Sequence, residues 1–136
     1  MIKPKKYEDT KLIDHLKKLF PLCRSLTGED TRATLKYFEN FHKEFKRIKF
    51  KTGSKVFDWE IPKEWNIKDA YFEHIETGER YAEFKKNNLH IVGYSKPINK
   101  TISRDNLLNN LFTIKKQPNA IPYITSYYKK RWGFCI

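Results

Sequence analysis

The hydrophobic pattern of this chain changes once, close to residue 46, and that change limits the folds it can adopt. Before residue 46, apolar side chains recur at the three- and four-residue spacing of helices with one apolar face. After it, apolar and polar side chains alternate in short runs separated by turn residues, which is typical of strands. The sequence therefore predicts an α+β fold, with two N-terminal helices followed by a β-rich domain that holds one short helix. We place the boundary between residues 1–50 and residues 51–136.

The helical part is expected to be a pair of packed helices. The first spans residues 9–20 and ends before Pro21, because the residue that precedes a proline is pushed out of the α region. Residues 21–28 have the composition of a connecting loop. Thr27 is expected to cap the second helix, whose apolar stripe extends as far as Phe45.

The β-rich part is expected to contain hairpins. Ile48 and Phe50 alternate with lysines before a turn at residues 52–54, which predicts either a hairpin that reverses there or two successive strands. A second hairpin is predicted to reverse at Thr77 and Gly78. Further elements are expected in chain order: a buried strand from Leu89, a short helix capped by Ser103, and a last strand over residues 121–128.

The formal net charge of +12 raises the question of a nucleic-acid partner, because strongly basic domains often bind phosphates. The basic residues comprise 22 Lys and 6 Arg, spread along the chain, whereas Arg is the usual reader of bases. Nucleic-acid binding is therefore not favoured, and a missing acidic partner would explain the same excess. No apolar run approaches a membrane span and the N-terminus lacks a signal core, so a cytoplasmic location is expected.

Motifs for metal or nucleophilic chemistry are absent from the sequence. His74 and Glu76 match the H-x-E of zinc deaminases, but the Cys pair that completes such a site is missing. Cys23 and Cys135 are expected to be reduced thiols. There is no HExxH, GxSxG or glycine-rich phosphate loop. We therefore expect no metal or cofactor in this chain.

Two stretches nevertheless qualify as candidate binding sites. The first is LCRSLTG, residues 22–28, where Arg24 can bind a carboxylate through its guanidinium fork or tie the loop to a helix end. The second is SYYKKRWGF, in which Tyr128, Arg131 and Trp132 form either a ligand wall or the core of an interface.

Longer segments carry a family resemblance. They read FPLCRSLTG, KVFDWEIPKEWNIKDAYF, NNLHIVGYSKPI and QPNAIPYITSYYKKRWGFC, and their order and spacing resemble the N-terminal part of bacterial aminopeptidase-like proteins of unknown function. These proteins are found in polysaccharide-biosynthesis gene clusters. The resemblance implies a zinc-exopeptidase-type α/β core interrupted by a β-rich insertion. Residues 1–50 would open that core, and residues 51–136 would form a truncated insertion.

The resemblance also bears on activity, because the family's zinc ligands lie downstream of the RWGFC stretch. This chain is therefore expected to be an N-terminal fragment, inactive alone, whose partner is the missing C-terminal portion or another chain. Its aromatic end would then pack against an absent core. The substrate-binding candidates are Arg24, Thr27, Tyr128, Arg131 and Trp132. The alternative is a stand-alone protein- or ligand-binding module with an aromatic C-terminal contact surface, so the question of enzyme activity stays open.

Overall fold

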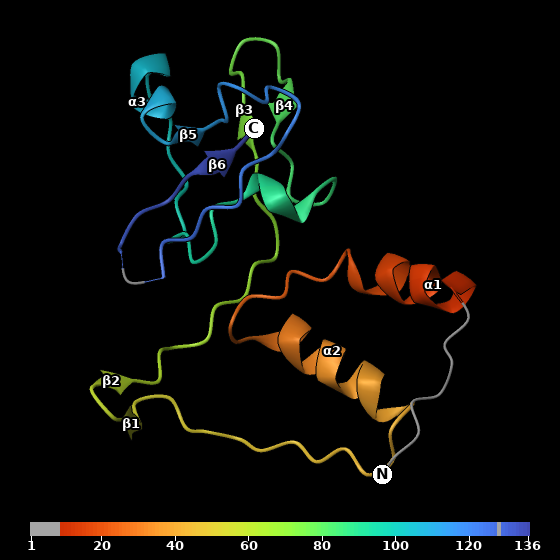
Figure 1. The fold of residues 1–136 in the computed structure, drawn as a ribbon. Coiled ribbons are helices and arrows are strands. Elements are labelled where there is room, and N and C mark those ends of the chain that lie inside the picture. Colours follow the sequence, from red (N-terminus) through yellow and green to blue (C-terminus); the bar gives the residue numbers. More distant parts are fainter. Residues whose placement is uncertain (1–8, 128) are drawn as a thin grey trace. The chain divides into compact units, whose positions relative to one another are not determined.

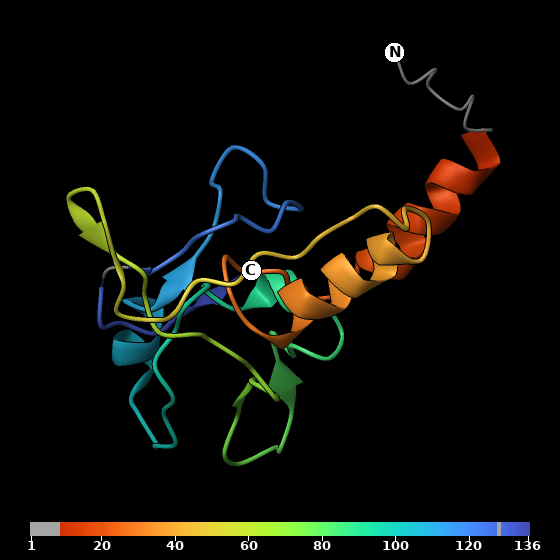
Figure 2. The ribbon, with the colours of Figure 1, turned by 90° about the horizontal axis from the view of Figure 1, so that it is seen from below.

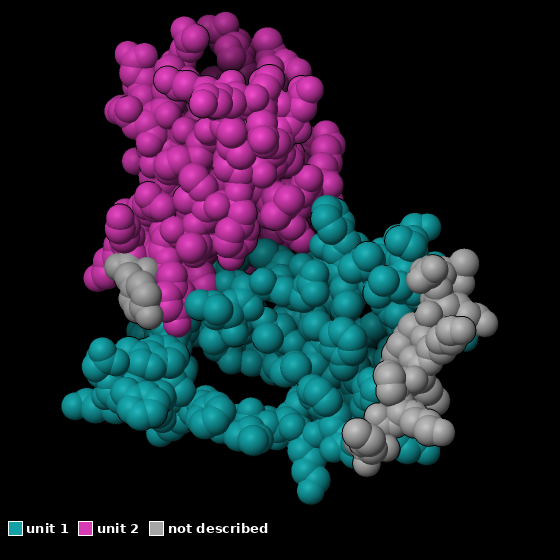
Figure 3. Space-filling model, in the orientation of Figure 1, with its two compact units in different colours: residues 1–66 teal, residues 67–136 magenta. Residues whose placement is uncertain are grey.

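The structure is a computed structural model that describes residues 9–127 and 129–136. It divides into two compact units, Met1–Asn66 and Ile67–Ile136 (Figure 3). Helices and short strand pairs occur together, so the predicted α+β class is confirmed. The boundary after residue 50, which would separate a peptidase core from its insertion, stays a prediction. No helix in the described ranges has both the length and the apolar character needed to cross a membrane.

Unit 1 begins with two helices, α1 (Asp9–Leu19) and α2 (Glu29–Glu39), which lie alongside each other (Figures 1 and 2). The presence of both predicted helices is thus confirmed, but α2 ends at Glu39 and does not reach Phe45 as predicted. They meet through His15, whose Nδ1 lies 2.5 Å from the Tyr37 hydroxyl oxygen. The His15 ring also packs edge-on against Phe41, with ring centroids 5.0 Å apart. Leu19 is buried, whereas Leu16 keeps 55% of its surface exposed.

The predicted cap of α2 is wrong by one residue. Gly28, not Thr27, occupies the N-cap position, with φ 114° and ψ −179°, and it has no side chain to hydrogen bond to the helix. A Cβ at Gly28 would lie 2.6 Å from the Trp65 carbonyl oxygen and 2.8 Å from Asn66 Oδ1. Only glycine combines this backbone conformation with so close an approach of another segment. Tertiary packing therefore determines where α2 begins.

The first hairpin of unit 1 pairs β1 (Lys55–Val56) with β2 (Trp59–Glu60) in antiparallel register. Its reversal lies at residues 57–58, so the prediction of a hairpin turn at residues 52–54 is wrong. Those residues form a separate turn, in which the Ser54 amide donates to the Lys51 carbonyl oxygen at 3.1 Å. The predicted strand at Ile48 and Phe50 is also not formed, because no described segment pairs with it.

Unit 2 contains the second hairpin, formed by β3 (Phe72–Glu73) and β4 (Arg80–Tyr81). Gly78 stands in its turn with φ 68°, which confirms the predicted reversal. The 3-10 helix η1 (Asn88–His90) and helix α3 (Arg104–Leu108) follow. The hydroxyl of Ser103 accepts from the Asn106 amide at 3.4 Å, as expected for the predicted cap.

The core of unit 2 forms where β6 (Phe134–Cys135) pairs in parallel with β5 (Leu111–Phe112). Isolated bridges replace the strands predicted from Leu89 and over 121–128: one joins Ile91 to Phe134 and another joins Gly93 to Thr125. The burial expected for the segment that begins at Leu89 is nevertheless present, at Ile91 and Val92. The buried apolar side chains of this unit are Ile91, Val92, Trp132, Phe134 and Cys135.

The C-terminal aromatic stretch therefore lies inside unit 2. Trp132 and Phe134 retain only 9% and 7% exposure, and Gly133 lets the chain pass so close that a Cβ would lie 2.7 Å from the Phe112 ring. The expectation that this end would pack against an absent core is wrong. The aromatic contact surface of the alternative binding module is likewise absent at Trp132 and Phe134, because both side chains are buried within unit 2.

Candidate functional site

The connector between α1 and α2 is held in a defined shape by backbone and side-chain hydrogen bonds. The Arg24 amide donates to the Leu22 carbonyl oxygen at 2.8 Å, which makes a tight turn. The Cys23 amide donates to Asp30 Oδ2 at 2.8 Å, in the first turn of α2. Thr31 Oγ1 donates to the Ser25 carbonyl oxygen at the same distance. Side chains at the start of α2 thus fix the loop that precedes it.

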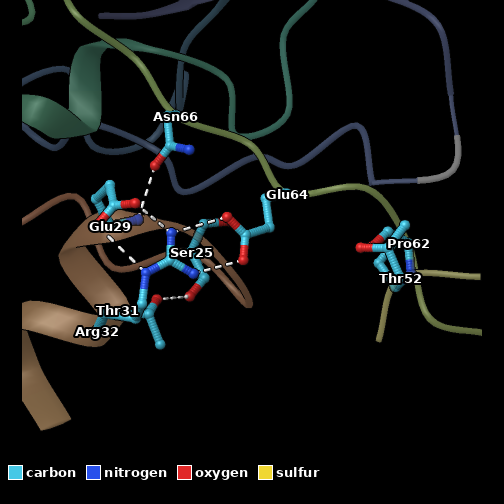
Figure 4. Close-up of polar contacts among 8 residues, drawn as sticks. All are labelled: Ser25, Glu29, Thr31, Arg32, Thr52, Pro62, Glu64 and Asn66. Carbon is cyan, nitrogen blue, oxygen red and sulfur yellow. Dashed lines mark hydrogen bonds and ion pairs between the residues drawn. The ribbon is translucent and has the colours of Figure 1, made fainter. Parts of the chain in front are cut away.

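The start of α2 is also tied to residues 64–66 (Figure 4). Arg32 spans two carboxylates: its Nη2 donates to Glu64 Oε2 at 2.8 Å and its Nε donates to Glu29 Oε2 at 3.2 Å. The Glu29 amide donates to Asn66 Oδ1 at 2.7 Å. We call Glu29, Arg32, Glu64 and Asn66 the polar clamp. Farther along, Thr52 Oγ1 donates to the Pro62 carbonyl oxygen at 3.1 Å.

The electrostatics of the polar clamp follow from its geometry. Hydrogen bonds from Arg32 hold the pKa values of Glu29 and Glu64 below their ordinary range, and those carboxylates raise the pKa of the guanidinium. The first turn of α2 carries the carboxylates of Glu29 and Asp30, and the side-chain oxygen Oδ1 of Asn66 accepts from the Glu29 amide. The clamp therefore fixes structure, and its carboxylates would repel an anionic ligand at this helix end.

Arg24 is the charged group that the connector leaves available. Its side chain is exposed, and within residues 9–127 and 129–136 its guanidinium forms no hydrogen bond or ion pair. Neighbouring Cys23 is a poor nucleophile, because burial and then Asp30 raise the pKa of its thiol. Thr27 is half-buried just before Gly28. The connector thus presents one cation from a fixed loop, which is suited to binding a carboxylate.

The second candidate stretch lies in unit 2, and its described residues Arg131 and Trp132 contact other residues of that unit. Arg131 Nη2 donates to the Thr125 carbonyl oxygen at 3.0 Å, and its guanidinium lies 5.4 Å from the Phe112 ring centroid. Trp132 is buried beneath Lys100, whose Nζ lies 5.7 Å from the indole ring. Tyr128 lies outside the described residues. The predicted substrate-binding role of this stretch stays a prediction.

The described residues do not fit a zinc ion. No group of three or more His, Cys, Asp or Glu side chains converges among them. Three histidines have other partners: His15 contacts Tyr37, His74 Nδ1 lies 3.2 Å from the Thr77 hydroxyl, and His90 Nδ1 donates to the Cys135 carbonyl oxygen at 2.8 Å. No step of a metal-dependent reaction is therefore assigned to these side chains.

Sequence reasoning identified the connector but missed the polar clamp that supports it. Glu29 and Arg32 stand three residues apart on α2, and that spacing is a readable signal for an ion pair. Glu64 joins them from 32 residues away, and no local pattern predicts such a contact. The sequence pattern places Gly28 at the end of a loop, but glycine is also a recognised residue at the N-cap of a helix, and that signal could have located the start of α2.

Two comparisons with known proteins cover almost the whole chain. A Clostridium acetobutylicum protein named "Putative polysaccharide biosynthesis protein with aminopeptidase-like domain" is 47% identical over 121 residues. That match spans 89% of this chain and 27% of the relative. A solved structure, described as that of a "putative peptidase" from Clostridium acetobutylicum, superposes with a TM-score of 0.86 at 45% identity. It covers 93% of this chain, which in turn covers 30% of the solved chain.

These matches confirm the resemblance to aminopeptidase-like proteins that the sequence segments indicate. The chain spans less than a third of the length of either relative. A family model matches residues 64–136, which is more than half of the chain and includes all of unit 2. This chain therefore belongs to the family described as "Domain of unknown function (DUF2172)".

Proposed function

We propose that this chain supplies the helical segment and the accessory domain of an aminopeptidase-like hydrolase. The observation that carries the proposal is the extent of the match: 89% of this chain aligns at 47% identity with 27% of a relative named for its aminopeptidase-like domain. In this proposal the catalytic metal is held by residues outside this chain. The contribution of this chain is then to shape the substrate site and to stabilise the assembled protein.

Arg24 is the residue that we assign to ligand binding. It projects from a connector that hydrogen bonds hold on both sides, so the backbone that carries its guanidinium needs no further ordering when a ligand binds. A guanidinium can bind a carboxylate through two parallel hydrogen bonds. We infer that Arg24 contacts a carboxylate of a peptide-like substrate or product. Lys36, which is exposed on α2, is a matched cation outside the connector.

Hydrolysis assays test the proposal directly. The chain should be assayed with zinc on an aminoacyl p-nitroanilide, first alone and then co-expressed with the part of the Clostridium acetobutylicum relative outside the matched region. We expect hydrolysis only from the combination, since zinc must activate a water at a site with suitable ligands. Zinc-dependent hydrolysis by this chain alone would refute the proposal.

The role of Arg24 is tested by measuring the KM of variants of that combined protein. Arg24→Ala is expected to raise KM for a carboxylate-bearing peptide by about 10- to 150-fold, since a charge-assisted hydrogen bond contributes roughly 1.5–3 kcal/mol. Lys36→Ala should leave KM unchanged. An equal effect of both variants would show that the connector does not bind the carboxylate.

A further inference from the structure

An extended segment between α2 and β1 has the residue pattern of a β-strand, but it pairs with no described strand. Residues 46–50 are in no helix or strand, and their backbone groups hydrogen bond to no described residue. Figure 1 shows this part of unit 1 as a single unaccompanied trace that leads to β1. Ile48 and Phe50 keep 79% and 71% of their surfaces exposed. The segment thus exposes both apolar side chains and backbone donors.

The side chains of this segment follow the period of a half-buried strand. In an extended chain, Ile48 and Phe50 share one face, and Arg47 and Lys49 share the other. An apolar row opposite a basic row is the pattern of a strand with one face packed and one face in water. Phe57, at the adjacent hairpin tip, is 99% exposed. The sequence therefore specifies a strand, whereas the described residues of unit 1 supply no neighbour for it.

We propose that residues 46–50 become a β-strand by pairing with an edge strand of the aminopeptidase-like portion that relatives carry outside the matched region. The inference rests on the proposed function. Most of the Clostridium acetobutylicum relative, of which this chain matches 27%, is available to provide that strand. Strand addition uses main-chain hydrogen bonds for affinity and alternate side chains for specificity. The apolar row would then be buried against that portion.

Charge argues that the occupant is not a second copy of this chain. Residues 46–51 carry four cations and no carboxylate, and among the described residues only Arg47 of this segment has an acidic partner, Glu39, at 2.5 Å. Two copies paired along this segment would set basic side chains opposite one another, and like charges across a strand pair are destabilising. The occupant is therefore a strand with acidic side chains facing Lys49 and Lys51.

Amide hydrogen exchange is the primary experiment. The samples are the full chain alone and the full chain co-expressed with the remaining part of the Clostridium acetobutylicum relative. Amides of residues 46–50 are expected to exchange without protection in the free chain and to be protected at least tenfold in the complex. The Val92 amide, which donates to the Gly133 carbonyl oxygen at 3.1 Å, reports the folding of unit 2 in both samples.

The outcomes separate this inference from the proposed function. A complex in which residues 46–50 remain unprotected overturns the strand pairing and leaves the proposed function in place. Failure of a folded chain to form any complex overturns both. Protection that appears in the chain alone, together with a dimer by light scattering, identifies a second copy as the occupant and overturns the inference.

Proline variants provide an independent test. Adjacent amides of a strand point to opposite edges, so Lys49→Pro and Phe50→Pro remove donors from different edges. One of them should weaken the complex at least tenfold relative to its alanine counterpart, Lys49→Ala or Phe50→Ala, and the other should weaken it less. Lys115→Pro, in the exposed turn closed by the Gln117 amide and the Ile114 carbonyl oxygen, is the control. Proline variants that bind like their alanine counterparts would contradict the pairing.

Discussion

Replacing Gly28 by alanine should destabilise unit 1 through two separate effects. The backbone of Gly28, at φ 114° and ψ −179°, lies in a region that is essentially restricted to glycine, and holding alanine there costs about 1–3 kcal/mol. The new Cβ would also lie 2.6 Å from the Trp65 carbonyl oxygen, which is backbone and cannot rotate away. Displacing that segment would break the hydrogen bond from Glu29 to Asn66, whose net contribution is about 0.5–1.5 kcal/mol.

The expected loss is therefore roughly 2–4 kcal/mol in the free energy of unfolding, summed from these two effects. For a unit of this size, each kcal/mol lowers Tm by about 4–8 °C. Far-UV circular dichroism during heating reports the loss, because α1 and α2 provide most of the helical signal.

Gly53→Ala is the matched control for this prediction. Gly53 lies in the same unit at φ 83°, but the nearest atom to its Cβ would be Glu60 Oε1, at an ordinary contact distance of 3.7 Å. Gly53→Ala should therefore lose only the free energy needed to hold alanine in the left-handed region, about 1–2 kcal/mol. If Gly28→Ala lowers Tm no more than Gly53→Ala, the close approach of Trp65 and Asn66 does not restrict this position.

Three further predictions concern pH, packing and thiol reactivity. The pKa values of Glu29 and Glu64 lie below 4.5 in the folded chain, so the two carboxylates stabilise the fold above pH 4.5 and lose this effect as pH falls through their folded pKa values. Arg32→Leu should therefore make the free energy of unfolding, measured from urea curves, less sensitive to acid. Gly133→Ala would place a Cβ 2.7 Å from an aromatic ring carbon of β5, and it should lower the urea midpoint by an amount equivalent to about 1–3 kcal/mol. Cys23 should react with iodoacetamide at neutral pH more slowly than a free thiol, because burial raises its pKa, and mass spectrometry should show rapid alkylation only in urea.

The elements that the sequence predicted well are those that local signals determine. Pro21 marks the end of α1, Ser103 caps α3, and Gly78 allows the reversal between β3 and β4. Each signal acts within a few residues of the element that it controls. Such signals do not depend on which segment lies opposite in the fold, so they can be read from one sequence.

The elements that the sequence missed depend on distant partners. The reversal of the first hairpin falls at Phe57, whose positive φ of 53° is unusual for an aromatic residue, rather than at the better turn sequence around Gly53. The parallel pairing of Leu111 with Phe134 joins residues far apart in the chain. In the candidate site, Arg24 could be proposed from its loop, but its supporting contact between Arg32 and Glu64 could not.

The two units are stabilised by different means, and this difference bears on the strand pairing that we propose. Among the described residues, the buried apolar side chains other than Leu19 all lie in unit 2. Unit 1 relies instead on the polar clamp, whose exposed ion pairs contribute little to stability because solvent screens them. The clamp therefore fixes the geometry of unit 1 without adding much stability. Burial of Ile48 and Phe50 against an added strand would supply the missing apolar contribution, at roughly 25 cal/mol per Å². In this proposal, unit 1 reaches its full stability only when the extended segment is paired.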